Sequence, residues 1–242
     1  MPLHLGGTPE ELAPVAVLPG DPDRAHLIAH EFLESARCYS QVRGLVGYSG
    51  IWKGCPLTVQ ASGMGGPSAA IICEELAMLG VKTIIRIGTC GTLQAGVSAG
   101  SLVIANAACA CDGASSQLAS VAGYAPAASW GVTAALVAAA QASGTAFRVG
   151  TVASMDLFYD PRQAVTAGLR NLGVLALEME AAAVFTVAAL RGLQAGAVFA
   201  VTDTIEGQVR AERALIDRTV RSMIEVALDA ALAHAAGAGG QC

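Results

Sequence analysis

The chain has 242 residues, of which 54% are hydrophobic and only 14% charged, and its formal net charge is −5. The absence of a basic block argues against nucleic acid as a partner, because such binding depends on clustered lysines and arginines. No apolar run reaches the roughly 18–20 residues that a membrane helix needs, and residues 1–12 show no secretory signal, so a cytoplasmic protein without membrane contact is expected.

Short apolar runs alternate with alanine-rich stretches along the chain, which is typical of strands covered on both faces and of the helices between them. The predicted strands are 15–18, 57–61, 83–87, 102–108, 147–152, 174–177 and 197–201. The predicted helices are 23–32, 67–79, 132–141, 162–171, 180–190 and 211–234.

Residues 48–52 and 56–60 flank Lys53-Gly54 and predict a hairpin, so the sheet is expected to be mixed. The predicted fold is a single α/β domain over residues 1–242, with a central mixed β-sheet flanked by helices and a flexible tail at 235–242. Charged residues are well below the roughly 25% of an average soluble protein. This composition predicts that part of the surface is buried in a homo-oligomer.

Arg86 is the most informative residue, because it lies in an apolar strand-like run directly before Gly88-Thr89-Cys90-Gly91, which predicts a turn. A guanidinium keeps its charge at any accessible pH, and burying it unpaired is costly. Either a carboxylate pairs with it or it binds an anion at the strand end. Backbone N–H groups and a hydroxyl in the turn favour phosphate. Cys109-Ala110-Cys111 has no nearby histidine, so no metal site is expected.

Two further loops follow predicted strands. Gly20 allows the backbone to approach a ligand closely, and Arg24 lies in a first helical turn, where a cation opposes the helix dipole and so suggests another role. A solvated surface turn is the alternative. The segment 62–68 is glycine-rich but lacks the lysine of a P-loop. Within it, Met64 is flanked by glycines and is expected to contact a ligand.

Acidic residues follow two other strands. Of Glu178 and Glu180, one could stabilise the start of the next helix, and the other could accept hydrogen bonds from a sugar diol. Asp203, at the end of an apolar run, could act as a proton donor with a raised pKa or as a turn cap. An anion site, a diol acceptor, apolar cover and an acid together predict cleavage of an N-glycosidic bond by an anionic nucleophile.

The chain resembles the hexameric bacterial nucleoside phosphorylases, the group of purine nucleoside and uridine phosphorylases. The resemblance extends from His4 to about Arg221. It rests on seven segments in the family's order: Leu18-Pro19-Gly20-Asp21-Pro22-Asp23-Arg24, Val42-Arg43-Gly44, Gly63-Met64-Gly65, Arg86-Ile87-Gly88-Thr89-Cys90-Gly91, Ser154-Met155-Asp156-Leu157-Phe158-Tyr159, Leu177-Glu178-Met179-Glu180-Ala181-Ala182 and Thr202-Asp203.

The resemblance implies a role for each matched residue. The phosphate ligands would be Gly20, Arg24, Arg86, Thr89 and, from a neighbouring subunit, Arg43. The ribose ligands would be Met64, Met179, Glu180 and, again from a neighbour, His4. The base would contact Phe158, Leu177 and Thr202. Asp203 would protonate the purine N7, with Arg213 positioning it. The family needs no metal or organic cofactor, uses inorganic phosphate as co-substrate, and forms at least a dimer, usually a hexamer built as a trimer of dimers.

Some segments depart from the purine branch. Residues 204–210 are shorter than expected and lack a histidine after the aspartate, and Asp112-Gly113-Ala114-Ser115 is more similar to the uridine branch. Uridine enzymes, however, have no acid at the Asp203 position and carry a Gln-x-Arg pair that Asp160-Pro161-Arg162-Gln163 does not reproduce. A purine nucleoside phosphorylase is therefore favoured. The alternatives are a uridine phosphorylase, a nucleosidase that uses water, and a non-catalytic nucleoside-binding protein.

Overall fold

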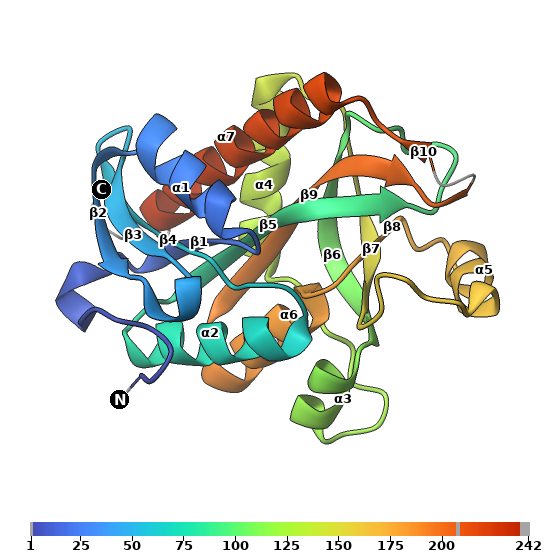
Figure 1. The fold of residues 1–242 in the computed structure, drawn as a ribbon, viewed down its shortest axis with the longest axis horizontal. Helices are drawn as coiled ribbons and strands as arrows, with labels where there is room; N and C mark the ends of the chain where they lie inside the picture. The colour runs from blue at the N-terminus through green and yellow to red at the C-terminus, as the bar shows by residue number, and fades with distance from the viewer. Residues whose placement is uncertain (1, 207–208, 238–242) are drawn as a thin grey trace.

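A computed structural model describes residues 2–206 and 209–237, whose strands join in one mixed sheet (Figure 1). In the sheet order β10-β9-β6-β7-β8-β5-β1-β4-β3-β2, the strands are β10 (Val209–Arg210), β9 (Gln194–Thr204), β6 (Leu102–Cys111), β7 (Phe147–Met155), β8 (Ala176–Glu178), β5 (Thr83–Thr92), β1 (Val15–Pro19), β4 (Cys55–Gln60), β3 (Gly47–Trp52) and β2 (Glu34–Ser40).

The helices are α1 (Pro22–Glu31), α2 (Gly66–Met78), α3 (Gly113–Ala119), α4 (Trp130–Ser143), α5 (Gln163–Asn171), α6 (Ala181–Arg191) and α7 (Arg213–Gly237). Two 3₁₀ turns, η1 (Pro9–Glu11) and η2 (Val42–Gly44), complete the elements. The predicted mixed sheet with flanking helices is confirmed, as is the β3–β4 hairpin. The tail was predicted to begin too early, because α7 continues to Gly237; residues 238–242 lie outside the described part of the chain.

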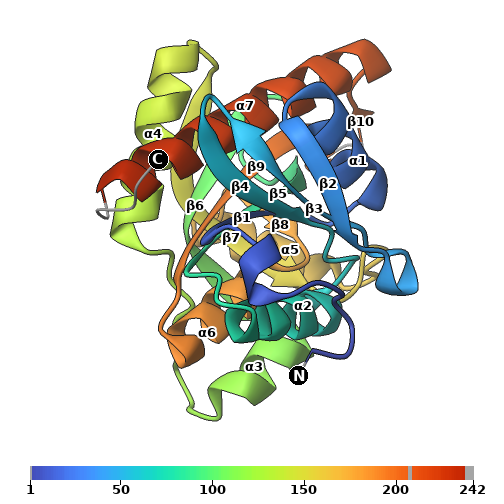
Figure 2. The same ribbon diagram turned by 90° about the vertical axis from the view of Figure 1, so that its left-hand side faces the viewer.

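Helices cover both faces of the sheet. In Figures 1 and 2, α2 and α6 lie side by side on one face, while α4 and α7 lie together on the other. The strands between these layers are apolar on both faces, and Leu18, Ile84 and Ile85 are completely buried. No helix in residues 2–206 and 209–237 has both the length and the apolar character needed to cross a membrane.

The sheet curls back on itself, because β9 pairs with both β5 and β6 while β7 and β8 complete the ring. This closure corrects the predicted turn at residues 88–91, which are part of β5 and pair with β9 across a register shift. The glycine makes room for the side chain that follows β9: a Cβ on Gly91 would lie 2.4 Å from Ile205 Cδ1. The backbone groups expected to bind phosphate therefore take part largely in strand pairing.

Candidate active site

The strand ends form one cleft of about 1130 Å³. It is lined by residues at or just after the ends of β1, β4, β7, β8 and β9, and by Arg86 and residues 88–91 of β5. Of the residues predicted for the site, these line the cleft: Gly20, Arg24, Met64, Arg86, Thr89, Phe158, Leu177, Met179, Glu180, Thr202 and Asp203. Three others, His4, Arg43 and Arg213, do not line it. The fold thus gathers six separate segments of the chain at one place.

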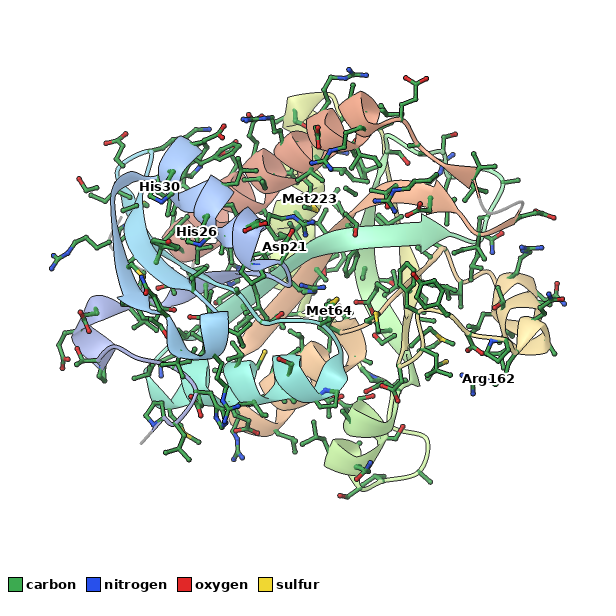
Figure 3. The ribbon with its side chains drawn as sticks, in the orientation of Figure 1. Asp21, His26, His30, Met64, Arg162 and Met223 are labelled. Carbon is green, nitrogen blue, oxygen red and sulfur yellow. The ribbon has the colours of Figure 1, made fainter. Side chains whose placement is uncertain are left out.

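The loop after β1 brings the backbone against Arg86. Asp21 caps α1 by accepting a hydrogen bond from the Asp23 N–H at 2.9 Å, which fixes the turn. A Cβ on Gly20 would lie 3.0 Å from Arg86 Nη1 and 3.1 Å from the carbonyl oxygen of Gly63. A side chain at position 20 would therefore force the guanidinium or the Gly63 backbone to shift. Figure 3 shows Asp21 and Met64 near the middle of the molecule, with Arg162 away toward α5.

Arg24 faces the same cleft and makes no side-chain hydrogen bond or ion pair with any residue in the described ranges. Burial, reinforced by the positive charge of Arg86, lowers the pKa of Arg24. A buried guanidinium without a hydrogen-bonded partner favours the binding of an anion beside it.

Arg86 has a carboxylate partner in this structure. Its Nη2 lies 2.5 Å from Glu180 Oε2, and both side chains are only 5% exposed. Nη1 donates to the carbonyl of Leu18 at 3.3 Å, and Nε is buried without a partner. The sequence favoured an anion over a carboxylate at Arg86. Instead, Glu180, the N-cap residue of α6, pairs with it. The guanidinium therefore lines the cleft with its positive charge already balanced by a carboxylate.

The two glutamates have separate roles. Glu178 is buried and accepts the backbone N–H groups of Glu180 at 2.8 Å and Ala181 at 2.9 Å, together with the Ser154 hydroxyl. Burial, followed by the negative charge of Glu180, raises the pKa of Glu178 to about 7. Glu178 is therefore the stabiliser of the α6 start. Glu180, whose Oε1 accepts the N–H of Gly65 at 2.7 Å, faces Arg86.

Part of the cleft lining is apolar and exposed. Met64 is 83% exposed, Phe158 is 73% exposed and Tyr159 is 91% exposed. Large apolar side chains this exposed usually mark a surface that a ligand or partner covers. The sequence prediction missed Tyr159 and Met155 as lining residues, although the aromatic pair Phe158-Tyr159 in a loop was a signal for the first of them.

Asp203 lies at the end of β9, where the Thr202 hydroxyl donates to its Oδ2 at 2.6 Å. Its cationic neighbour differs from the one predicted. Arg210, brought opposite Asp203 by β10 pairing, has Nη1 3.3 Å from Oδ1. Arg213 begins α7, is 87% exposed and pairs with Asp217 one helical turn away. In this structure Arg210, rather than Arg213, contacts the Asp203 carboxylate.

His4 and Arg43 lie outside the cleft of their own chain. The Nδ1 of His4 is 2.8 Å from Glu75 Oε1, and the same carboxylate accepts the backbone N–H groups of Leu3, His4 and Leu5. Arg43 is exposed in η2 at a φ of 55°. Any role of these two side chains in catalysis depends on a second copy of the chain.

The part of the chain that the structure describes holds no group of three or more histidine, cysteine or acidic side chains arranged for a metal. The independence from metals expected from the sequence stays a prediction. Within the cleft, the chain supplies anion-binding, diol-accepting and acidic side chains: Arg24, Arg86, Glu180 and Asp203.

Comparison with known proteins agrees with this geometry. The family model described as the phosphorylase superfamily matches residues 14–235. A DeoD-type purine nucleoside phosphorylase of Jannaschia sp. (strain CCS1) is 40% identical over 96% of this chain and 99% of its own length. Proteins of the same description from Roseobacter denitrificans and Bacillus cereus (strain ATCC 14579) are 37% and 39% identical, over 96% of this chain and 100% and 99% of their lengths. The family resemblance read from the motifs is confirmed: the chain belongs to the phosphorylase superfamily.

Proposed function

We propose that this protein is a pentosyltransferase that catalyses the reversible phosphorolysis of purine ribonucleosides and deoxyribonucleosides. The products are the free base and ribose 1-phosphate or deoxyribose 1-phosphate. The observation that carries the proposal is that one cleft is lined by two arginines, a ribose-type acceptor, an aromatic ring and an acid: Arg24, Arg86, Glu180, Phe158 and Asp203. The names of the full-length relatives support the purine over the uridine reading.

Each of these groups has a part in the proposed reaction. Phosphate held by the two guanidiniums attacks C1′ of the sugar while the glycosidic bond breaks, and the bonding electrons leave with the base. The phosphate dianion stabilises the positive charge that develops on the sugar. Asp203 donates its proton to N7 of the purine, which makes the base a better leaving group; such general acid catalysis typically contributes about 10²–10⁴-fold. Glu180 accepts hydrogen bonds from the sugar hydroxyls.

The proposal includes an assembly and a location. The enzyme is a homo-oligomer in which His4 and Arg43 complete the site of a neighbouring copy, with a hexamer as the proposed state. It acts in the cytoplasm and uses phosphate as co-substrate without a metal or organic cofactor. The exposed apolar residues of the cleft and the position of His4 on the outer side of α2 support the assembly.

The experiment that tests the function measures free base from inosine, adenosine, guanosine and uridine, each with and without phosphate. Release from purine nucleosides only when phosphate is present is the expected result. Base release without phosphate would show a nucleosidase, and release from uridine alone would show a pyrimidine enzyme. Tight nucleoside binding with no base release would show a binding protein.

A further inference from the structure

The ion pair between Arg86 and Glu180 occupies both of the groups that the two substrates need. Glu180 Oε2 lies 2.5 Å from Arg86 Nη2, and Oε1 accepts the Gly65 N–H at 2.7 Å, so each oxygen already has a donor. Both side chains are 5% exposed. In this low-dielectric setting their attraction is far stronger than at the surface.

Neither ligand can use its partner fully while the pair is intact. A phosphate beside Arg86 would also lie beside the negative charge of Glu180, which repels it. A sugar hydroxyl that donates to Glu180 Oε2 competes directly with the guanidinium. Arg24 has no partner in the described part of the chain and can capture the anion first, but the charge of Arg86 stays neutralised until Glu180 turns to another donor.

We propose that phosphate and nucleoside bind with positive cooperativity within one site, because each of them takes one partner of the Arg86–Glu180 pair. The first ligand bears the free-energy cost of separating the pair, and the second finds its own partner already released. This inference rests on the proposed function, since it assigns the phosphate to Arg86 and the sugar to Glu180. By linkage, the factor by which phosphate tightens nucleoside binding equals the factor by which nucleoside tightens phosphate binding.

Calorimetric titration of the intact protein tests the coupling. Sulfate replaces phosphate as the dianion, so that inosine is not consumed. Four dissociation constants are measured: sulfate alone, inosine alone, and each in the presence of saturating amounts of the other. Both affinities are expected to rise by the same factor, about 5–150-fold, the usual range of coupling between sites. Independent binding of both ligands, with factors near one, would overturn the coupling while leaving the proposed function in place. If neither ligand binds, both proposals fall.

Glu180→Gln isolates the cause. This variant removes the negative charge that neutralises Arg86 but keeps an oxygen that can accept a hydrogen bond from a sugar hydroxyl. Sulfate alone should then bind more tightly than to the unmodified protein, and the coupling factor should fall toward one.

Glu74→Gln is the matched control, because Glu74 also pairs with an arginine, Arg191 at 2.5 Å, but does not line the cleft. It removes the same charge and should leave both the sulfate affinity and the coupling within about twofold. An equal gain in sulfate affinity in both variants would show general electrostatics and would overturn the proposal. Circular dichroism and a thermal melt confirm that each variant is folded.

Discussion

The two ends of the cleft are built in different ways. At the anion end, Arg86 is a buried residue of a central strand, and its counter-ion is the first residue before α6, so both are held by the core. At the base end, Phe158 and Tyr159 lie in a loop between β7 and α5 and expose most of their surface. Charges are positioned before a ligand arrives, whereas the apolar contacts gain most of their burial from the ligand or a neighbouring copy.

This difference separates the expected effects of substitution. Changes at the anion end should alter phosphate affinity and, because the groups are buried, also the stability of the fold. Changes at the base end should alter the rate or affinity for the nucleoside and leave stability nearly untouched. Variants at the two ends therefore test whether stability and ligand affinity respond separately.

The largest effect is expected for Asp203→Asn. An amide cannot donate the proton that the leaving purine requires, so kcat for inosine should fall by about 10²–10⁴-fold. Sulfate affinity should be unchanged, because strand pairing places Asp203 opposite Gly91, five residues along β5 from Arg86. Glu206→Gln is the control: it removes a 70% exposed carboxylate in the same segment and should leave kcat within about twofold. Unchanged turnover in Asp203→Asn would refute the assignment of the proton donor.

The sequence predicted the anion end better than the contacts around Asp203, for a physical reason. Gly20, Arg24 and Arg86 lie within a few residues of apolar strands, and strand ends meet at one edge of such a sheet. Arg210 reaches Asp203 through the strand β10, whose two exposed residues are too few to give a strand signal. Arg213 was predicted from family resemblance alone, which does not reveal that its side chain pairs with Asp217 in this structure.

The next largest effect is a pH dependence of stability that comes from Glu178, which accepts the backbone N–H groups of Glu180 and Ala181. Its pKa is raised from the ordinary 4.5 to about 7, first by burial and then by the charge of Glu180. Between pH 4.5 and about pH 7, Glu178 is therefore protonated in the folded state and ionised in the unfolded state. Its contribution to the free energy of unfolding is complete below pH 4.5 and is lost as the pH rises through 7. The total loss is about 3 kcal/mol.

Glu178→Gln should remove this dependence, because a neutral amide has no proton to lose. Urea unfolding at a fixed protein concentration, measured from pH 5 to pH 8, gives the difference in free energy of unfolding between the variant and the unmodified protein. That difference should shift in favour of the variant as the pH rises. A difference that is constant across the range would show that Glu178 does not titrate there.

Non-local pairing explains the other main difference between prediction and structure. Residues 88–91 have the composition of a turn, yet they continue β5 because β9, about a hundred residues later, pairs along their whole length. Local sequence does not encode such a partner. Similarly, two glutamates bracket Met179 in the sequence, but only the fold shows that Glu178 meets backbone N–H groups while Glu180 meets a guanidinium.

A smaller effect is expected for Gly20→Ala at the anion end. The added methyl would lie 3.0 Å from Arg86 Nη1, so the guanidinium must shift. The KM for phosphate should rise about tenfold, which corresponds to about 1.4 kcal/mol. The control is Gly96→Ala, where a Cβ meets nothing within 4 Å, and its KM should not change. If Gly20→Ala also keeps the original KM for phosphate, the Arg86 guanidinium can shift without loss of phosphate affinity, and the prediction is wrong.

The smallest effect is expected for Phe158→Ala, and it tests the base end directly. Stacking of an aromatic ring on the purine contributes about 0.5–1.5 kcal/mol beyond its buried area, so KM for inosine should rise several-fold while KM for phosphate stays the same. The melting temperature should move little, because the ring is 73% exposed and loses few contacts within its own chain. Leu172→Ala, which removes an equally exposed apolar side chain outside the cleft, should change neither constant. A large loss of stability in Phe158→Ala would mean that the loop is held by this ring before any ligand binds, and the contrast between the two ends would then disappear.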